Sequence, residues 1–213
     1  MSALDAEGWI LAGGRSMRMG RDKAGVEIAR VPLLEHMLGK LRDLGLRARV
    51  AGMRESVDGM TAEIVNDLHP NCGPLSGMET ALIASEMSLI LILGVDMPLI
   101  ETHFLQWMLT RAQASGAIAT IPKVLGEPQP LCVVCRRELL GSVSRSIESG
   151  DYKVTAAIEN AGTEGRPDFF DAERAVATGA WESSLPVYRQ FINCNRREDV
   201  ALAEALLVRN PML

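Results

Sequence analysis

The sequence predicts a single α/β domain of three layers, with helices on both faces of a mostly parallel central sheet. Segments with the pattern of strands alternate with segments with the pattern of helices along most of the 213 residues, and this alternation is typical of such a sheet. The most apolar run, Leu89–Leu93, has no polar face. A strand of this kind is covered on both sides, as central parallel strands are. We therefore expect one domain over residues 1–213, because a chain of this length buries an ample core.

The first half of the chain opens with a short apolar strand at residues 9–12. Pro32 suits the first position of a helix over 32–44, in which apolar residues recur every three or four positions and which Gly45 ends. The stretch 66–74 contains two prolines and a glycine, so we expect a loop there. The other elements expected in this half are strands at 47–51 and 61–65, an irregular helical segment from residue 55, and a helix at 75–86.

The second half continues the alternation. The apolar strand at 88–95 precedes a helix over 101–115, which Gly116 closes. Asn195 is placed to cap the last helix, with Glu198 three residues later as in a capping box. The remaining expected elements are strands at 117–121, 129–135 and 191–192, helices at 136–149, 154–160 and 196–208, and a segment of ambiguous type at 164–180.

Three candidate site residues follow expected strands directly. Gly13, Asp67 and Asp96 each come just after the last residues of such a strand. Ligands of parallel sheets bind at the carboxyl ends of the strands. We therefore expect these three residues to lie on one edge of the sheet.

A glycine-rich loop with several cations follows the first strand. Gly13 and Gly14 lack a Cβ, so their backbone N–H groups can approach an anionic ligand closely. The loop has neither the Gly-Lys-Ser/Thr of a Walker A motif nor the Gly-x-Gly-x-x-Gly of dinucleotide-binding proteins. Although the chain has a net charge of −5, a cluster of cations follows the glycines: Arg15, Arg18, Arg21 and Lys23. This pattern predicts a phosphate chain as the ligand, and the alternative is a solvated turn.

Composition excludes several classes of partner. The acidic net charge and an aromatic content of 4% argue against a nucleic-acid interface. Residues 1–7 carry acids where a signal peptide needs lysine or arginine, and no apolar run approaches the ~18–20 residues of a membrane helix. We expect a cytoplasmic protein that does not bind a membrane.

The four cysteines are expected to be structural thiols. Cys132 and Cys135 lie three residues apart in a strand-like run, so their side chains point to opposite faces of the sheet. They cannot then hold one metal ion. Cys72 and Cys194 are isolated in the sequence, and a reducing compartment fits all four.

The run Leu11–Lys23, Leu-Ala-Gly-Gly-Arg-Ser-Met-Arg-Met-Gly-Arg-Asp-Lys, resembles the signature of nucleotidyltransferases of the Rossmann-like GT-A fold. In this form it looks like that of the molybdenum cofactor guanylyltransferases. The resemblance implies that the loop wraps the triphosphate of GTP and that Lys23 and Arg15 hold the leaving pyrophosphate. The residues that it implies for nucleotide binding in this loop are Leu11, Ala12, Gly13, Gly14 and Lys23.

Asp96 is the candidate metal ligand. A carboxylate at the mouth of a buried strand is costly unless it is hydrated, paired or bound to metal, and Mg²⁺ needs only one or two protein carboxylates when phosphates and water complete its shell. The alternative is an aspartate that starts the turn before Pro98. The run Gly94–Pro98 resembles the metal motif of the family, which implies that Asp96 binds Mg²⁺ and the nucleotide phosphates.

Two further segments resemble the family. Asp67, followed by the Gly-Pro-Leu-Ser-Gly of residues 73–77, resembles the second signature of the family. The resemblance implies that Asp67 binds the nucleotide on its guanine and ribose side. The alternative is an aspartate that only forms a turn. The segment around Asn193 and Asn195 resembles a late motif on the metal and substrate-phosphate side. Asn195 is explained equally well as a helix cap, whereas Asn193 has no such role.

The resemblance as a whole implies transfer of GMP from GTP to the phosphate of molybdenum–molybdopterin, with Lys23, Arg15 and Asp96 as catalytic residues. Three departures from the family concern the choice of base and the acceptor site: residues 51–54, residues 129–131, and Arg196-Arg197 in place of Thr-Pro. The alternatives are transfer from CTP to molybdopterin, transfer from another NTP to a sugar phosphate, and a carrier of molybdopterin without catalysis. Further expected partners are other enzymes of molybdenum cofactor synthesis and the recipient molybdoenzymes.

Overall fold

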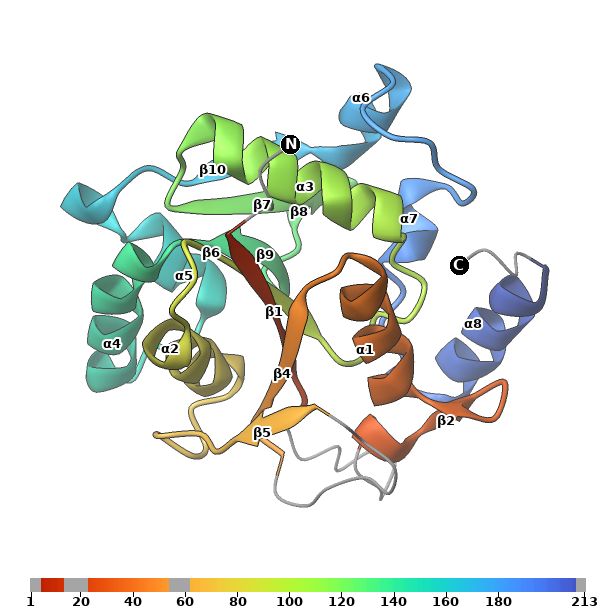
Figure 1. Cartoon of the computed structure of the whole chain (residues 1–213), viewed down its shortest axis with the longest axis horizontal. Helices are drawn as coiled ribbons and strands as arrows, with labels where there is room; N and C mark the ends of the chain where they lie inside the picture. Colours follow the sequence, from red (N-terminus) through yellow and green to blue (C-terminus); the bar gives the residue numbers. More distant parts are fainter. Residues whose placement is uncertain (1–4, 14–22, 54–61, 210–213) are drawn as a thin grey trace.

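The computed structural model describes residues 5–13, 23–53 and 62–209. They form a sheet with helices on both faces, as Figure 1 shows, so the three-layer α/β/α prediction is confirmed. Helices α1 (Leu33–Asp43) and α3 (Thr102–Ser115) lie on one side of the sheet, and α2 (Pro74–Ala84), α4 (Leu140–Ser149) and α5 (Val154–Glu159) lie on the other.

The sheet has the strand order β10-β7-β9-β6-β1-β4-β5 in the described part of the chain, and β8 pairs with the last two residues of β7. Strand β1 pairs in parallel with both β4 and β6, β5 is parallel to β4, and β10 is parallel to β7. Only β9, which runs antiparallel to β6 and β7, and the short β8 break the parallel arrangement. The strand bounds are β1 (Ala6–Leu11), β4 (Arg47–Ala51), β5 (Glu63–Val65), β6 (Leu89–Gly94), β7 (Ala119–Val124), β8 (Glu127–Pro128), β9 (Cys132–Cys135) and β10 (Asp168–Asp171).

Smaller elements complete the described fold. A two-stranded hairpin of β2 (Glu27–Ile28) and β3 (Val31–Pro32) precedes α1, and the last helix packs beside it, where the Ala29 N–H donates to Glu204. The remaining helical elements are α6 (Ala172–Ala177), α7 (Val187–Gln190), α8 (Arg197–Arg209) and the 3₁₀ turns Lys23–Gly25, Arg137–Leu139 and Gly162–Glu164. None of the described helices is long and apolar enough to cross a membrane.

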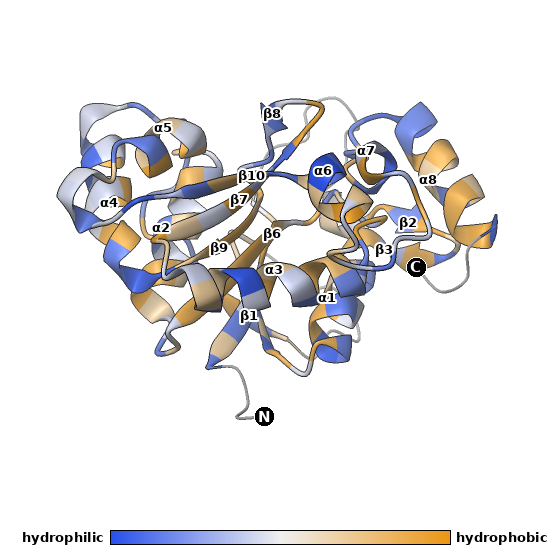
Figure 2. Cartoon of the chain, turned by 90° about the horizontal axis from the view of Figure 1, so that it is seen from above, coloured by the Kyte–Doolittle hydropathy of each residue, from blue (hydrophilic) through white to orange (hydrophobic). Residues whose placement is uncertain are grey.

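Apolar residues fill two cores, one on each face of the sheet. Alternate residues of β6 face opposite ways: Leu91 packs with α1 and α3, whereas Ile92 packs with α2 and α4. All six residues of β6 are buried, as predicted for a central strand. Figure 2 shows β6 and β9 as largely hydrophobic between helices whose outer surfaces are more hydrophilic.

Two expected details of the last sixty residues are wrong. No strand forms at 191–192, because Phe191 ends the helical turn α7 and its ring packs edge-on against Phe104 at 5.6 Å. The last helix begins one residue later than expected, at Arg197, and Asp199 rather than Glu198 accepts from the backbone N–H groups that precede the helix. The ambiguous segment 164–180 contains β10 and α6, and the segment expected from residue 55 begins outside the described residues.

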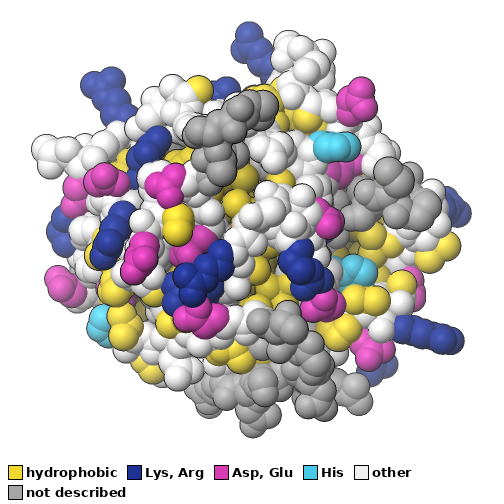
Figure 3. Space-filling model, in the orientation of Figure 1, with side chains coloured by type: hydrophobic (Ala, Val, Ile, Leu, Met, Phe, Trp, Pro, Cys, Tyr) yellow, Lys and Arg dark blue, Asp and Glu magenta, His cyan; other side chains and the backbone are white. Residues whose placement is uncertain are grey.

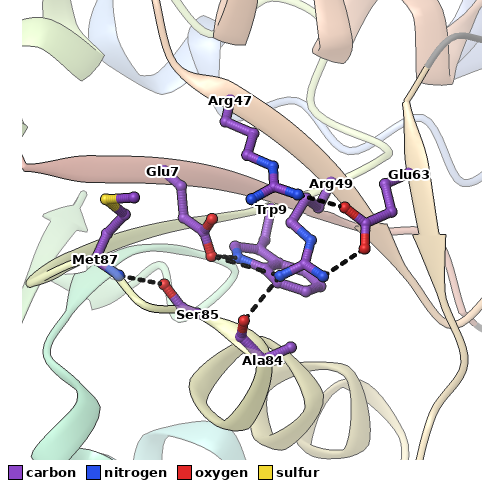
Figure 4. Close-up of polar contacts among 8 residues, drawn as sticks. All are labelled: Glu7, Trp9, Arg47, Arg49, Glu63, Ala84, Ser85 and Met87. Atoms are coloured by element: carbon purple, nitrogen blue, oxygen red, sulfur yellow. Dashed lines mark hydrogen bonds and ion pairs between the residues drawn. The ribbon is translucent and has the colours of Figure 1, made fainter.

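A buried arginine joins three neighbouring strands at the end of the sheet opposite to the carboxyl ends (Figure 4). Arg49 of β4 lies 4.0 Å from the carboxylate of Glu7, which is 1% exposed, and donates to Glu63 at 2.6 Å. It also donates to the carbonyl of Ala84 at 2.9 Å, and its guanidinium stacks over Trp9 at 4.5 Å. The contact set therefore fixes β1, β4 and β5 to the end of α2.

The substitution Arg49→Ala is expected to lower the free energy of unfolding by about 3 kcal/mol or more, because it leaves the buried Glu7 carboxylate without its cation. Arg47→Ala is the matched control, because Arg47 pairs with the same Glu63 but is 61% exposed, and an exposed pair contributes at most about 1 kcal/mol. Urea unfolding of both variants provides the comparison. Equal losses in the two variants would show that the Glu7–Arg49 pair does not stabilise the strands.

The described surface carries both signs of charge. On the face shown in Figure 3, lysine and arginine side chains alternate with aspartate and glutamate, and no broad basic area is seen among the described residues.

Candidate active site

The carboxyl ends of four parallel strands meet at one edge of the sheet. Gly13 follows β1, Gly52 follows β4, Asp67 follows β5 and Asp96 follows β6. The expectation that Gly13, Asp67 and Asp96 share this edge is therefore confirmed. Such an edge is where ligands bind in parallel sheets.

Two glycines bring the loops after β1 and β4 into direct contact. A Cβ on Gly52 would lie 2.7 Å from the Cα of Gly13 and 3.1 Å from Oδ2 of Asp67, and Gly52 has φ +83°. No other residue fits there without moving the loop. In the sequence, Gly52 is notable only as part of the departure from the family at residues 51–54. In the structure, its missing side chain leaves the space that Gly13 and Asp67 occupy. A glycine directly after a predicted strand is the signal that could have identified it.

Hydrogen bonds to the ends of β4 and β6 hold the backbone of Leu11 and Ala12, where the first loop begins. The Ala12 N–H donates to the carbonyl of Ala51 at 3.0 Å, and the Leu11 carbonyl accepts from Val95 at 3.2 Å. Leu11 and Ala12 are buried, whereas Gly13 is exposed. The predicted nucleotide loop therefore emerges from the centre of the sheet at Gly13.

Asp67 presents an acceptor atom that no described side chain satisfies. Its Oδ1 is buried without a hydrogen-bond partner in the described residues, and so is the hydroxyl of Ser76 in the first turn of α2. Burial raises the pKa of Asp67, and the nearby Ser76 hydroxyl partly opposes this rise without forming a bond of full geometry. Unsatisfied buried acceptors are costly, so this position is suited to a ligand that brings donors.

Gly77 completes the wall on this side. A Cβ there would lie 2.9 Å from the Leu11 side chain and 3.7 Å from Oδ1 of Asp67. The absence of a side chain at Gly77 therefore allows α2 to approach β1 and Asp67 closely.

Asp96 lies directly against the late asparagine segment. Asp96 is 8% exposed, and its backbone carbonyl accepts from the Cys194 N–H at 2.8 Å. Asn193 and Asn195 flank this contact, and the Asn195 N–H donates to the carbonyl of Asn193 at 2.8 Å. The structure thus brings together Asp96 and two asparagines that are about a hundred residues away in the sequence. Because the last helix begins at Arg197, Asn195 does not hold the position expected for its cap.

The acidic groups at this edge fit a magnesium ion that is shared with a nucleotide. The described residues contain no group of three or more His, Cys, Asp and Glu side chains that could hold a metal. Mg²⁺ does not require such a cage, because phosphate oxygens and waters fill most of its octahedral shell. A single carboxylate such as Asp96, on the same edge of the sheet as the loop predicted to bind phosphate, has the donor chemistry that this ion needs.

The cationic part of the loop lies mostly outside the described residues. Gly14 and Arg15 fall within 14–22, and of Lys23 only the backbone is described, as the first residue of a 3₁₀ turn over Lys23–Gly25. Ala24 in that turn is fully buried. The roles predicted for Gly14, Arg15 and Lys23 remain predictions.

The two central cysteines face opposite cores, as expected. Cys132 packs among the residues on the α1 and α3 side, and Cys135 packs on the α2 and α4 side. Both are fully buried, and burial raises the pKa of Cys135 to about 12 and that of Cys132 further. These thiols are protonated at neutral pH, and protonated thiols are poor metal ligands and poor nucleophiles.

The double variant Cys132→Ala/Cys135→Ala is expected to retain wild-type turnover at low temperature and to lose about 1 kcal/mol of stability per site, since each change removes one buried group of methyl size. Turnover at 15 °C and thermal melting are the measurements. A stoichiometric zinc signal in the wild-type protein that the double variant lacks would contradict the structural role of these thiols.

An open cavity of about 360 Å³ lies elsewhere, against the outer side of α3. None of the predicted site residues lines it, and its lining residues are His103, Gln106, Trp107, Ala180, Trp181 and Glu182. The carboxyl edge therefore remains the candidate active site.

A three-layer α/β/α fold, with a glycine loop and acidic residues at the carboxyl edge of its sheet, is the arrangement of a nucleotidyltransferase. The family model described as "MobA-like NTP transferase domain" matches residues 8–164, and the chain belongs to this family. It is 38% identical over 202 residues to a molybdenum cofactor guanylyltransferase of Xanthomonas euvesicatoria pv. vesicatoria, covering 90% of each chain. A probable molybdenum cofactor guanylyltransferase of Pyrococcus horikoshii is 30% identical over 198 residues, which cover 90% of this chain and 95% of the other.

A solved structure agrees with the fold. Molybdopterin-guanine dinucleotide biosynthesis protein A of Archaeoglobus fulgidus superposes with a TM-score of 0.77 at 21% identity, covering 95% of this chain and 99% of the other. The GT-A-like nucleotidyltransferase fold predicted from the sequence is therefore confirmed.

Proposed function

We propose that the chain transfers GMP from GTP to the phosphate of molybdenum–molybdopterin and releases pyrophosphate, as a step in molybdenum cofactor synthesis. The observation that carries this proposal is that Gly13, Asp67 and Asp96 lie along one carboxyl edge of the sheet in a chain of this family. The name of the Xanthomonas relative supports guanine and molybdopterin as the substrates. We expect the transfer to take place in the cytoplasm.

The reaction needs no nucleophilic side chain. A phosphate oxygen of molybdopterin attacks the α-phosphorus of GTP, a new P–O–P bridge forms, and the bond from the α-phosphorus to the bridging oxygen of the β-phosphate breaks. The electron pair of that bond leaves with pyrophosphate. Catalysis of such a transfer depends on positioning and on neutralisation of charge.

The first loop supplies the pyrophosphate side of this site. The backbone at Leu11, Ala12, Gly13 and Gly14 approaches the phosphates, and Arg15 and Lys23 balance the charge that grows on the leaving group. Among these residues the described contacts support Gly13, because it is exposed just after β1 and a Cβ there would lie 3.2 Å from the Cα of Gly52 and 3.4 Å from Oδ2 of Asp67. Backbone N–H groups in such a loop bind anions without a side chain.

Asp67 serves the guanine side. A carboxylate can accept from N1–H and the N2 amino group of guanine together, and its Oδ1 has no partner among the described residues. Burial raises the pKa of Asp67, and the Ser76 hydroxyl only partly opposes this rise. A ligand with two donors would favour the charged form of the carboxyl group. Cytosine offers a different set of donors, so this contact supports GTP over CTP.

Asp96 would hold Mg²⁺, with Asn193 and Asn195 on the side of the acceptor phosphate. The ion would supply charge neutralisation at the phosphates of both substrates. The chain itself contributes the position: the Cys194–Asp96 hydrogen bond keeps the asparagine segment beside the carboxylate. Other enzymes of molybdenum cofactor synthesis and recipient molybdoenzymes are the proposed protein partners.

Pyrophosphate release with each of the four NTPs tests the proposal. We expect release with GTP only, and only when Mg²⁺ and molybdopterin are both present. Release with CTP and molybdopterin would replace guanine by cytosine, and release with an NTP and a sugar phosphate would replace the acceptor. Binding of molybdopterin without release from any NTP would indicate a carrier and contradict the proposed function.

A further inference from the structure

Residues 180–196 join α6 to α8 and pass the carboxyl edge on the way. Apart from the four residues of α7, this segment contains no helix or strand. Its position therefore depends on contacts with the rest of the protein. Trp181 and Phe191 of this segment pack against Phe104 of α3, and Cys194 donates a hydrogen bond to Asp96 at the edge itself. Five further hydrogen bonds from the segment converge on a single carboxylate.

That carboxylate belongs to Glu101, which directly precedes α3 and is 6% exposed. Glu101 is the N-cap residue of α3, but its side chain makes no capping hydrogen bond to that helix. Its Oε1 accepts from the backbone N–H groups of Ser184 at 2.7 Å and Leu185 at 3.1 Å and from the Ser184 hydroxyl at 2.5 Å. Its Oε2 accepts from the Ser183 hydroxyl at 2.8 Å and from the Gln190 amide at 2.9 Å. A buried carboxylate with five donors satisfies its lone pairs within one segment.

A return contact makes the attachment two-sided. The Glu101 N–H donates to Oε1 of Gln190 at 3.3 Å, and Gln190 is fully buried. The segments 96–101 and 190–194 are therefore joined at both ends, by the Glu101–Gln190 pair and by Asp96–Cys194. Asn193 lies in the short stretch between these two attachments and is exposed.

The charge of Glu101 also acts on a buried lysine. Lys40 of α1 is 4% exposed, and burial lowers its pKa to about 8, while attraction to Asp43 and Glu101 opposes that shift. Glu101 thus lies in a region where opposite charges are buried together. Burying charged side chains such as these costs desolvation free energy. This cost favours a role for Glu101 beyond packing.

We propose that Glu101 is a positioning residue for nucleotidyl transfer, one that holds the segment 183–195 so that Asn193 stays beside Asp96. Glu101 contacts neither substrate. The inference rests on the proposed function, in which Asp96 and Asn193 serve the metal and the acceptor phosphate. Displacing a reacting group by about 1 Å can cost on the order of 10²-fold in rate, so a shift of this segment is felt in turnover.

Glu101→Gln and Glu182→Gln form the test pair. Glutamine keeps the size of the side chain but replaces one acceptor oxygen by an NH₂ group that faces other donors. Glu182 is an exposed neighbour in the same segment and takes part in none of these bonds, so its variant makes the same chemical change without disturbing them. Both variants are assayed with GTP and molybdopterin well below their substrate-free melting temperatures.

We expect Glu101→Gln to lower kcat by about 10- to 100-fold and to leave KM for GTP within about threefold. Asp67, which is proposed to bind guanine, follows β5, and β1 and β4 separate β5 from β6 and Asp96. Amide hydrogen exchange in the absence of substrate should increase over 183–195 in Glu101→Gln only. Glu182→Gln should match the wild-type protein in both measurements.

Two results would overturn the positioning role. Unchanged exchange over 183–195 in Glu101→Gln would show that the carboxylate does not hold the segment, and increased exchange with unchanged kcat would show that its position does not matter for transfer. A wild-type protein that releases no pyrophosphate contradicts the proposed function instead. In that case the exchange measurement, which needs no substrate, still decides whether Glu101 fixes the segment.

Discussion

Replacing Asp96 by asparagine is expected to lower pyrophosphate release by about 10³-fold or more. Asp96 follows the central strand and is fixed through its own carbonyl to Cys194, so the backbone of the site should survive the change. An amide is a much weaker ligand for Mg²⁺ than a carboxylate. A metal that neutralises phosphate charge contributes several kcal/mol to the transition state, and each 1.4 kcal/mol is about tenfold in rate.

Turnover and nucleotide binding with and without Mg²⁺ check this prediction. The variant should bind GTP equally in the presence and absence of the ion, whereas the wild-type protein should bind more tightly in its presence. Asp151→Asn is the control, because Asp151 lies in an exposed turn before α5 and an amide oxygen can keep its bond to the Lys153 N–H. Wild-type release by Asp96→Asn would remove Asp96 from the metal site.

Lys23→Ala is expected to slow transfer by about 10²–10³-fold, as loss of a single charge-stabilising donor does at other sites. The ammonium is a compact charge suited to a phosphate. Charge on the β- and γ-phosphates grows as the bond from the α-phosphorus breaks, so the contact is stronger in the transition state than in the ground state. Lys23→Arg should rescue only part of the activity, because a planar guanidinium cannot occupy the same point.

Pyrophosphate release and substrate-free melting together check the role of Lys23. Lys153→Ala is the matched control, since Lys153 is exposed and its side chain makes no cap to α5. Lys23→Ala should melt close to the wild-type temperature, because alanine can keep the backbone of the turn at 23–25 and leaves the buried Ala24 in place. Turnover within about threefold of wild type in a normally melting variant would take Lys23 out of the mechanism.

Much of the fold could be predicted because the sheet is buried on both faces. The uninterrupted apolar run of β6 and the periodic apolar residues of α1 leave little choice of element, and the strand ends then place Gly13, Asp67 and Asp96 on one edge. The opposite directions of Cys132 and Cys135 also follow from strand geometry alone. These are local consequences of pattern, and the structure confirms them.

The long-range polar contacts could not be predicted, because they join residues that are far apart in the sequence. Nothing local indicates that Arg49 pairs with Glu7, or that Glu101 holds residues 183–190 rather than starting α3 as a helical residue. The expected strand at 191–192 was wrong for the same reason, since tertiary packing of Phe191 overrides a short apolar pattern. The role of Gly52 was missed because it depends on the space that the absent side chain leaves for Gly13 and Asp67, and the sequence does not show that these residues are close.

The fate of the α-phosphate of GTP tests the central claim most directly. The wild-type protein is incubated with Mg²⁺, molybdenum–molybdopterin and GTP labelled at the α-phosphorus, and the products are separated and weighed by mass spectrometry. We predict that the label moves into a dinucleotide in which GMP is joined to the pterin phosphate, with one pyrophosphate released for each transfer, and that Asp96→Asn forms almost none. Label that remains in GTP, or that appears as free GMP without the dinucleotide, would contradict the assignment of this chain as a guanylyltransferase.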